Sequence, residues 1–277
     1  MNPIDQLFSR LQAERRKAFI PFVTAGDPDL DTTAKLLREA ARRGASLIEV
    51  GFPYSDPIAD GSVIQASYTR ALGNGLSVDS IFSAMRALNG IGVPLVAMVS
   101  YSLVHHRGPE RFIADAKVAG FSGAIVPDLP VEEADELAKI AALHDFKLIL
   151  LVTPTTPRER AIKIAQLSTG FVYCVSVVGI TGERSQLPPD LLEQLRWLRT
   201  QTPLPLCVGF GISTPDHVRM LRDSADGVIV GSALVRKLAA KKPVVEIVKD
   251  VGDLVDELSA ALSGSAGASP SRPLQSP

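Results

Sequence analysis

The sequence is poor in several features that mark specialised classes of protein. It has two cysteines, Cys174 and Cys207, each inside an apolar segment, which indicates reduced, buried thiols and argues against a disulfide framework. No apolar run approaches the roughly 20 residues that a membrane-spanning helix needs, so we expect no membrane association. The formal net charge is −1, so charge gives no reason to expect nucleic acid as a partner.

Chemical motifs of other enzyme classes are also missing. His105 and His106 are adjacent, but no His, Cys, Asp or Glu cluster has metal-ligand spacing, so we expect no metal. No GxGxxG follows the first apolar segment, which argues against a dinucleotide-binding fold. Lys147 opens an apolar segment rather than closing one, so a Schiff-base lysine is not supported. We interpret His144 and His217 as surface residues of helices.

The two ends of the chain predict its domain organisation. The first residues carry charges throughout without an apolar signal core, so we expect no secretory signal and a cytoplasmic protein. Residues 263–277 are small, polar and proline-rich, which is typical of a disordered tail. We expect residues 1–262 to form a single domain.

What the sequence does contain is an alternation of short apolar segments with longer amphipathic ones. Most of the apolar segments are continuous rather than alternating, which is typical of parallel strands covered on both faces. The segments are 18–24, 46–50, 94–99, 122–126, 147–152, 171–176, 205–210 and 226–230.

Eight such strands with helices between them predict a (β/α)8 TIM barrel, whose usual length is about 250 residues. A doubly wound open sheet is the alternative. We expect an extra N-terminal helix over residues 4–16 and two helices between residues 62 and 89. In the first repeat, Thr32 or Thr33 is expected to cap the helix and Gly44 to end it.

Active sites of such barrels lie where the strands end, which directs attention to the segment IEVGFPYSDPIADG. Glu49 ends an apolar strand, where partial desolvation raises a carboxyl pKa and suits it to proton transfer. Asp60 follows in a loop that we expect to be wetter, where a carboxylate stays ionised. The alternative is structural: Glu49 forms an internal ion pair and the aspartates cap the next helix. Asp56, between Ser55 and Pro57, is interpreted as a turn residue.

Glycines follow the last strands. VGFGIST comes after the seventh strand and IVGSALV continues the eighth, while Gly182 belongs to the long loop after the sixth. Barrels often bind phosphate through backbone N–H groups of the loops after strands seven and eight, and Ser232 adds a hydroxyl there. Neither segment contains Lys or Arg, so we expect binding by dipoles rather than by an ion pair. Taken singly, each segment is equally typical of a turn.

Six motifs together resemble one family. PFVTAGDPD, IEVGFPYSDPIADGSVIQ, VPDLPVEEA, VVGITGER, GFGIS and VGSALV are similar to those of the tryptophan synthase alpha subunit, in order, from about residue 4 to 262. The resemblance implies a (β/α)8 barrel and a lyase of tryptophan biosynthesis. Such an enzyme cleaves indole-3-glycerol phosphate to indole and glyceraldehyde 3-phosphate by a retro-aldol reaction.

The resemblance also implies residue roles. Glu49 matches the general acid and base, and Asp60 the aspartate that stabilises positive charge at the indole N–H. The substrate-binding matches are Phe22, Tyr173, Thr181 and Phe210, and the phosphate-binding matches are Gly182, Gly211, Gly231 and Ser232.

The family acts with a partner, a beta subunit that carries pyridoxal phosphate and receives the indole. The resemblance therefore implies no cofactor in this chain and an alpha2–beta2 tetramer. One loop departs from the family pattern: SYSLVHHRG keeps Tyr101 but lacks the Asn that commonly follows, in a loop that faces the partner. Two alternatives stay open, a sugar-phosphate isomerase or epimerase on the same barrel, and a non-catalytic allosteric partner.

Overall fold

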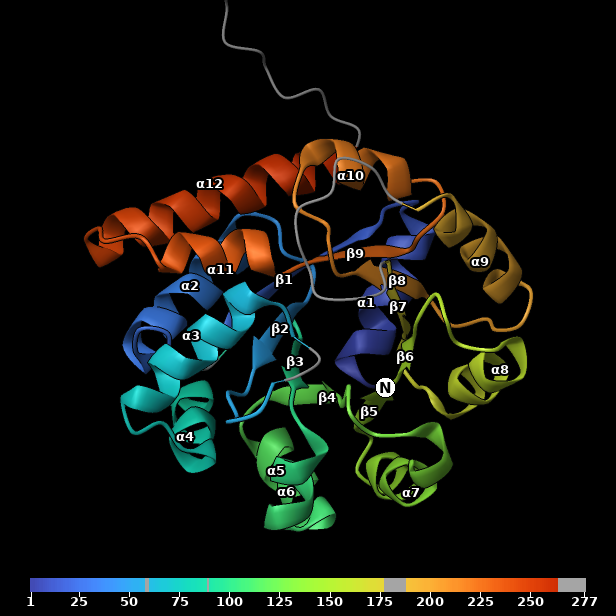
Figure 1. Ribbon diagram of the computed structural model, residues 1–277, viewed down its shortest axis with the longest axis horizontal. Helices are drawn as coiled ribbons and strands as arrows, with labels where there is room; N and C mark the ends of the chain where they lie inside the picture. The colour runs from blue at the N-terminus through green and yellow to red at the C-terminus, as the bar shows by residue number, and fades with distance from the viewer. Residues whose placement is uncertain (58–59, 89, 177–187, 264–277) are drawn as a thin grey trace, which may run out of the picture.

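A closed barrel of parallel strands forms the centre of the molecule (Figure 1). The computed structural model describes residues 1–57, 60–88, 90–176 and 188–263. Within them the strands are β1 (Ala18–Thr24), β2 (Ile48–Gly51), β3 (Leu95–Met98), β4 (Phe121–Ile125), β5 (Lys147–Ile149), β6 (Leu151–Val152), β7 (Val172–Val175), β8 (Leu206–Gly209) and β9 (Gly227–Val230).

The strand order shows how the barrel closes. The sheet runs β5-β4-β3-β2-β1-β9-β8-β7-β6, and every pair is parallel. Its two end strands, β5 and β6, are halves of one predicted segment that is interrupted at Leu150. Because these halves are consecutive in the chain, the sheet returns to its own beginning. The barrel prediction is confirmed, and the open sheet is excluded.

Helices form an outer layer around the barrel, except that α1 lies at the centre of the view, behind the strands (Figure 1). They are α1 (Pro3–Ala13), α2 (Leu30–Arg42), α3 (Ser62–Gly73), α4 (Val78–Leu88), α5 (Tyr101–Arg107), α6 (Pro109–Val118), η1 (Val131–Glu133), α7 (Asp135–Leu143), α8 (Arg158–Leu167), α9 (Pro189–Arg199), α10 (Pro215–Leu221), α11 (Ser232–Leu238) and α12 (Val244–Ser263). The extra helices at the N-terminus and between residues 62 and 89 are confirmed.

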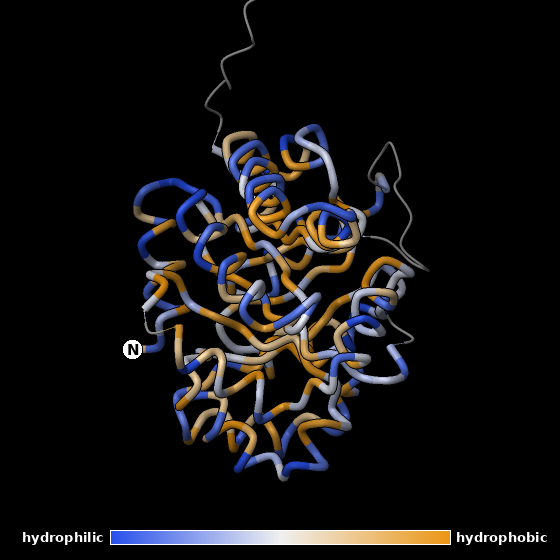
Figure 2. Tube along the Cα trace, turned by 90° about the vertical axis from the view of Figure 1, so that its left-hand side faces the viewer, coloured by the Kyte–Doolittle hydropathy of each residue, from blue (hydrophilic) through white to orange (hydrophobic). Residues whose placement is uncertain are grey.

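Strands and helices bury their apolar residues against each other. All seven residues of β1 are buried, as the continuous apolar run predicts. Figure 2 shows hydrophobic colouring concentrated along the central strands, with hydrophilic residues toward the outside. The N-terminal helix α1 adds Leu7 and Phe8 to this core, and the Phe8 ring lies 5.7 Å from that of Phe171.

Some local predictions are wrong. The cap of α2 is Asp29, whose carboxylate accepts the N–H of Thr32 at 2.6 Å, so neither Thr32 nor Thr33 caps the helix. Gly44 does follow the end of this helix, with a φ of +104°. His217 is not a surface residue: it is buried on α10, and its Nδ1 accepts the N–H of Ser213 at 3.4 Å.

Other predictions about composition have clear outcomes. Cys174 and Cys207 are free and buried, as expected, and burial raises the pKa of the Cys174 thiol to about 12. Among the described residues, no helix combines the length and apolar character needed to cross a membrane. Ser263 belongs to α12, and the remainder of the predicted tail lies outside the described residues.

Candidate active site

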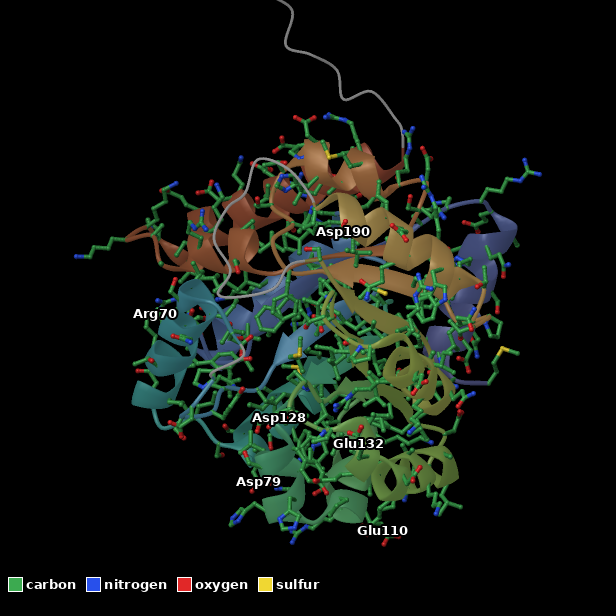
Figure 3. All side chains as sticks on the ribbon, turned by 45° about the vertical axis from the view of Figure 1, so that its right-hand side comes forward. Arg70, Asp79, Glu110, Asp128, Glu132 and Asp190 are labelled. Atoms are coloured by element: carbon green, nitrogen blue, oxygen red, sulfur yellow. The ribbon has the colours of Figure 1, made fainter. Side chains whose placement is uncertain are left out.

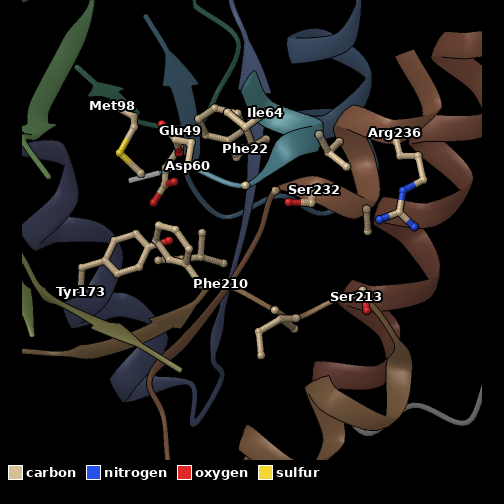
Figure 4. A pocket seen from close by; sticks show the side chains of 17 residues that line it. Phe22, Glu49, Asp60, Ile64, Met98, Tyr173, Phe210, Ser213, Ser232 and Arg236 are labelled. Carbon is tan, nitrogen blue, oxygen red and sulfur yellow. The ribbon is translucent and has the colours of Figure 1, made fainter. Parts of the chain in front are cut away.

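The carboxyl ends of the strands surround a pocket that collects most of the predicted site residues (Figure 4). Parallel pairing brings them together, because Phe22 of β1 lies in register with Glu49 of β2. The lining residues that sequence reasoning singled out are Phe22, Glu49, Asp60, Tyr173, Phe210, Gly211, Gly231 and Ser232. Thr181 and Gly182 lie outside the described residues.

Glu49 is a buried carboxyl group without a partner. It is fully buried, and neither of its carboxyl oxygens has a hydrogen-bond partner among the described residues. Burial alone raises its pKa well above the usual value, because an ionised carboxylate loses its hydration there. The alternative that Glu49 forms an internal ion pair is therefore wrong. A carboxyl whose pKa is raised in this way is suited to donate a proton and to take it back.

Asp60 stands at the start of α3, where its backbone carbonyl accepts the Gln65 side-chain amide at 2.9 Å. The cap of α3 is Gly61, and no side chain caps this helix, so the alternative role of Asp60 as a cap is wrong. Burial, and then the negative charge of Asp128, raise the pKa of Asp60 to about 6. The expected wetter loop is thus corrected: Asp60 is largely buried yet mostly ionised at pH 7. The two carboxyl groups thus have different electrostatic environments, as a pair dividing acid and base roles requires.

Aromatic side chains form the walls of the pocket. Phe22 and Phe210 lie on opposite sides of the two carboxyl groups in Figure 4. The Tyr173 ring meets that of Phe210 edge-on, with centroids 5.8 Å apart. Phe210 has a φ of +66°, which is an outlier for a bulky residue, and Ser176 donates its hydroxyl hydrogen to the Phe210 carbonyl. Backbone strain of this kind concentrates at functional sites.

Two strand glycines make room for these walls. A Cβ on Gly51 would lie 2.3 Å from the Phe22 ring, and one on Gly209 would lie 2.1 Å from the Tyr173 hydroxyl oxygen. Both distances are shorter than van der Waals contact allows. The close packing of each ring over its neighbouring strand therefore depends on the missing side chain.

The far end of the pocket is polar. Ser213, Ser232 and Arg236 lie there, away from the carboxyl groups (Figure 4), and Gly211 and Gly231 also line the pocket. Arg236 directly follows the inspected segment and adds a cation to the lining, so binding by dipoles alone stays a prediction. The signal was available in the sequence: Arg236 is four residues after Ser232 on α11, and residues so spaced share a helix face. Sequence reasoning also missed the apolar lining residues Gly61, Val63, Ile64, Met98, Ile212, Ile229 and Ala233.

Other side chains are clearly separate from this pocket. Asp56 accepts the Ser55 hydroxyl at 2.7 Å and is exposed, which agrees with a turn residue. Asp128 lies below the centre of the view in Figure 3 and does not line the pocket, and its carboxylate accepts the backbone N–H of Tyr101 at 2.8 Å. Among the residues described, no group of three or more His, Cys, Asp or Glu side chains is placed to hold a metal ion.

Comparison with known proteins assigns the family. The family model described as tryptophan synthase alpha chain matches residues 8–262. The chain belongs to the tryptophan synthase alpha chain family. Cleavage of indole-3-glycerol phosphate is the role of this family, so a lyase-type enzyme and a part in tryptophan biosynthesis follow for its members.

Individual relatives match over almost their whole length. The tryptophan synthase alpha chain of Rhodopirellula baltica is 48% identical over 275 residues, covering 95% of this chain and 99% of the relative. The crystal structure of tryptophan synthase subunit alpha from Legionella pneumophila has a TM-score of 0.86 at 34% identity, over 95% of this chain and 99% of that one. A tryptophan synthase structure from Mycobacterium tuberculosis also scores 0.86, at 32% identity, over 95% and 98%. The name alpha chain implies a beta-subunit partner.

Proposed function

We propose that this chain cleaves indole-3-glycerol phosphate to indole and glyceraldehyde 3-phosphate. The observation that carries the proposal is the buried, unpartnered carboxyl of Glu49 beside the ionisable Asp60, inside a pocket with aromatic walls. Family membership supplies the substrate, and the pocket supplies groups suited to its chemistry.

The reaction follows from proton transfer. Glu49 protonates the ring carbon that carries the glycerol phosphate chain, and Asp60 stabilises the positive charge that develops at the indole nitrogen. The bond between ring and chain then breaks, and its electron pair returns to the ring. The hydroxyl proton of the chain passes to the Glu49 carboxylate as the aldehyde forms. Acid and base roles thus alternate on one residue, whose raised pKa suits both.

The remaining predicted residues receive binding roles in this proposal. Phe22, Tyr173 and Phe210 pack around the indole, and Gly211, Gly231 and Ser232 bind the phosphate. Roles for Thr181 and Gly182 stay predictions, as they lie outside the described residues.

We further propose that the chain works in an alpha2–beta2 tetramer, with pyridoxal phosphate confined to the beta subunit and no cofactor in this chain. A pocket of about 630 Å³ lies beside the loop after β3. Its walls include Tyr54, Asp56, Leu103 and Asp128, near the segment expected to face the partner. Location in the cytoplasm stays a prediction of the sequence.

An indole-release assay tests the proposal. Wild-type protein should release indole from indole-3-glycerol phosphate, and Glu49→Gln should lose at least about a hundredfold in rate, as loss of a general acid and base does. Asp56→Asn is the matched control, because this carboxylate is exposed in the same loop. The variant should release indole within about twofold of the wild-type rate, since surface substitutions usually change free energies by no more than about 0.5 kcal/mol. Wild-type turnover by Glu49→Gln would remove the proposed role.

The same assay, joined to a binding measurement, separates the alternatives. A compact sugar-phosphate isomerase or epimerase site should not hold an indole, so calorimetric binding of indole propanol phosphate argues against it. Any indole release by the isolated chain excludes a purely non-catalytic partner. Repeating the assay with added beta subunit tests the partnership, since association should change the rate.

A further inference from the structure

The polar end of the pocket contains a charge that the phosphate-binding glycines do not explain. Among the described lining residues, Arg236 is the one cation, and it lies at the end opposite Glu49 and Asp60 (Figure 4). Its position four residues after Ser232 on α11 places both side chains on the same face of that helix. An arginine there is always charged and presents several N–H donors in a fixed fork.

A second observation at the same end points to a polar ligand. Ser213 also lines the pocket, and its hydroxyl oxygen is buried without a hydrogen-bond partner among the described residues. Buried hydroxyls are rarely left unpaired in folded proteins. A ligand oxygen at this end would satisfy that hydroxyl, whereas an apolar group would leave it unpaired.

We propose that Arg236 determines the specificity of this site for a dianionic phosphate group. The proposal rests on the proposed function, which places the substrate phosphate at this end. Backbone N–H groups and serine hydroxyls bind any phosphate oxygen, but they carry no net charge. The guanidinium adds a full positive charge, which favours the doubly charged phosphate over the singly charged one.

The proposal predicts a characteristic pH dependence of binding. The second pKa of a phosphate monoester is near 6, so the ligand changes from singly to doubly charged between about pH 5.5 and 7.5. Affinity should rise over this interval in the wild-type protein and rise less when the Arg236 charge is removed. Asp60, whose pKa is raised to about 6, titrates over the same interval, but it is present in every variant compared.

Calorimetric titration with indole propanol phosphate at pH 5.5 and 7.5 measures this effect. Arg236→Met should bind about fivefold more weakly at pH 7.5, the upper range for an exposed ion pair, with a smaller loss at pH 5.5. Arg236→Lys should recover much of the affinity, because it restores the charge. Lys237→Met is the matched control, since it removes the same charge from the next position of α11 without lining the pocket.

The uncharged analogue indole propanol separates recognition of charge from structural damage. Its affinity should be equal in the wild-type protein and Arg236→Met. The proposal is overturned if Arg236→Met binds indole propanol phosphate as wild type does at both pH values. Equal weakening toward both ligands overturns it as well, because that pattern reports a structural role. Failure of wild-type protein to bind indole propanol phosphate would instead count against the proposed function itself.

Discussion

At the scale of single residues, the two carboxyl groups of the pocket have raised pKa values for partly different reasons. Burial alone acts on Glu49, whereas burial and the charge of Asp128 both act on Asp60. The second cause can be removed without touching the pocket, because Asp128 does not line it. Variants of these residues therefore test the electrostatics and the chemistry separately.

Asp128→Asn should shift the acid limb of the pH profile of kcat/KM. In the proposed function Asp60 is ionised when it stabilises the positive charge at the indole nitrogen, so activity should fall as the pH drops through about 6. Removing the negative charge of Asp128 lowers the pKa of Asp60 and moves this limb to lower pH. The shift should be less than one unit, because burial is the larger cause.

The substrate phosphate also titrates near pH 6, but it is the same for every variant, so the comparison isolates Asp60. Asp56→Asn is the control, as Asp56 is not among the causes of the Asp60 shift. An acid limb unchanged in Asp128→Asn would contradict this account.

Glu49→Gln should stabilise the fold increasingly as the pH rises. Between the model-peptide value of 4.5 and its raised pKa, the folded protein keeps a proton on Glu49 that the unfolded chain releases. Stability of the wild-type protein therefore falls with rising pH over this interval, by at most about 1.4 kcal/mol per unit from this group. The glutamine variant lacks this loss, so its advantage in urea unfolding should be larger at pH 8 than at pH 5.

Glu39→Gln supplies a control of opposite sign. Hydrogen bonding to Arg42 lowers the pKa of Glu39 to about 2, despite its partial burial. The stabilisation by this group is fully present above about pH 4.5 and is lost only as the pH falls toward 2. Its removal should therefore destabilise the protein equally at pH 5 and pH 8. A constant difference for Glu49→Gln would show that its pKa is not raised.

Sequence reasoning identifies Glu49 because a charged residue at the end of an apolar strand conflicts with its surroundings. It misjudges Asp60, since the solvation of a loop depends on which strands and helices close over it. It misses Arg236 because the inspected segment IVGSALV ends at Val235. The spacing of four residues between Ser232 and Arg236 nevertheless predicts that both lie on one face of a helix. His217 was misplaced because its environment is set by tertiary packing.

At the scale of elements, the strand ends hold the aromatic walls through close packing over glycines. Gly209→Ala should displace the Tyr173 ring, because the new Cβ lies 2.1 Å from its hydroxyl oxygen and 2.6 Å from Cζ. Overpacking of this kind costs about 1–3 kcal/mol of stability, and movement of the ring should raise KM. Thermal unfolding and steady-state kinetics measure the two effects.

Gly73→Ala is the matched control, because a Cβ there meets no atom within 4 Å at the end of α3. It should leave KM unchanged and should not lower stability. Adding Tyr173→Phe to Gly209→Ala removes the nearest atom and should recover part of the stability. No recovery, together with an unchanged KM, would mean that the ring is not the group displaced.

The elements themselves are largely predictable from the sequence. Continuous apolar runs give the strands to within about two residues, the usual error of element boundaries. The interruption at Leu150 is not predictable from hydropathy, since the run 147–152 stays apolar while the pairing passes from β4 to β7. The cap of α2 was misassigned because Asp29, Thr32 and Thr33 are all capable residues, and backbone geometry selects Asp29.

At the scale of the whole molecule, the barrel separates stability from function along its axis. The pocket lies at the carboxyl ends of the strands, while α1 packs its apolar face against the core from outside that site. Ion pairing and ring packing connect α1 to the rest of the molecule: Asp5 pairs with Lys147 at 2.6 Å, and Phe8 packs against Phe171. Substitutions in α1 should therefore change the stability of the protein without changing its KM.

Phe8→Ala tests this separation. Truncation of a buried phenylalanine costs about 3–5 kcal/mol, and Phe8 is 7% exposed with its ring against Phe171. The free energy of unfolding in urea should fall by that amount, whereas KM measured at 25 °C should not change, because Phe8 does not line the pocket. Ser9→Ala, on the exposed face of the same helix, should alter stability by no more than about 0.5 kcal/mol. A rise in KM for Phe8→Ala in protein that remains folded would show instead that packing of α1 is coupled to the geometry of the pocket.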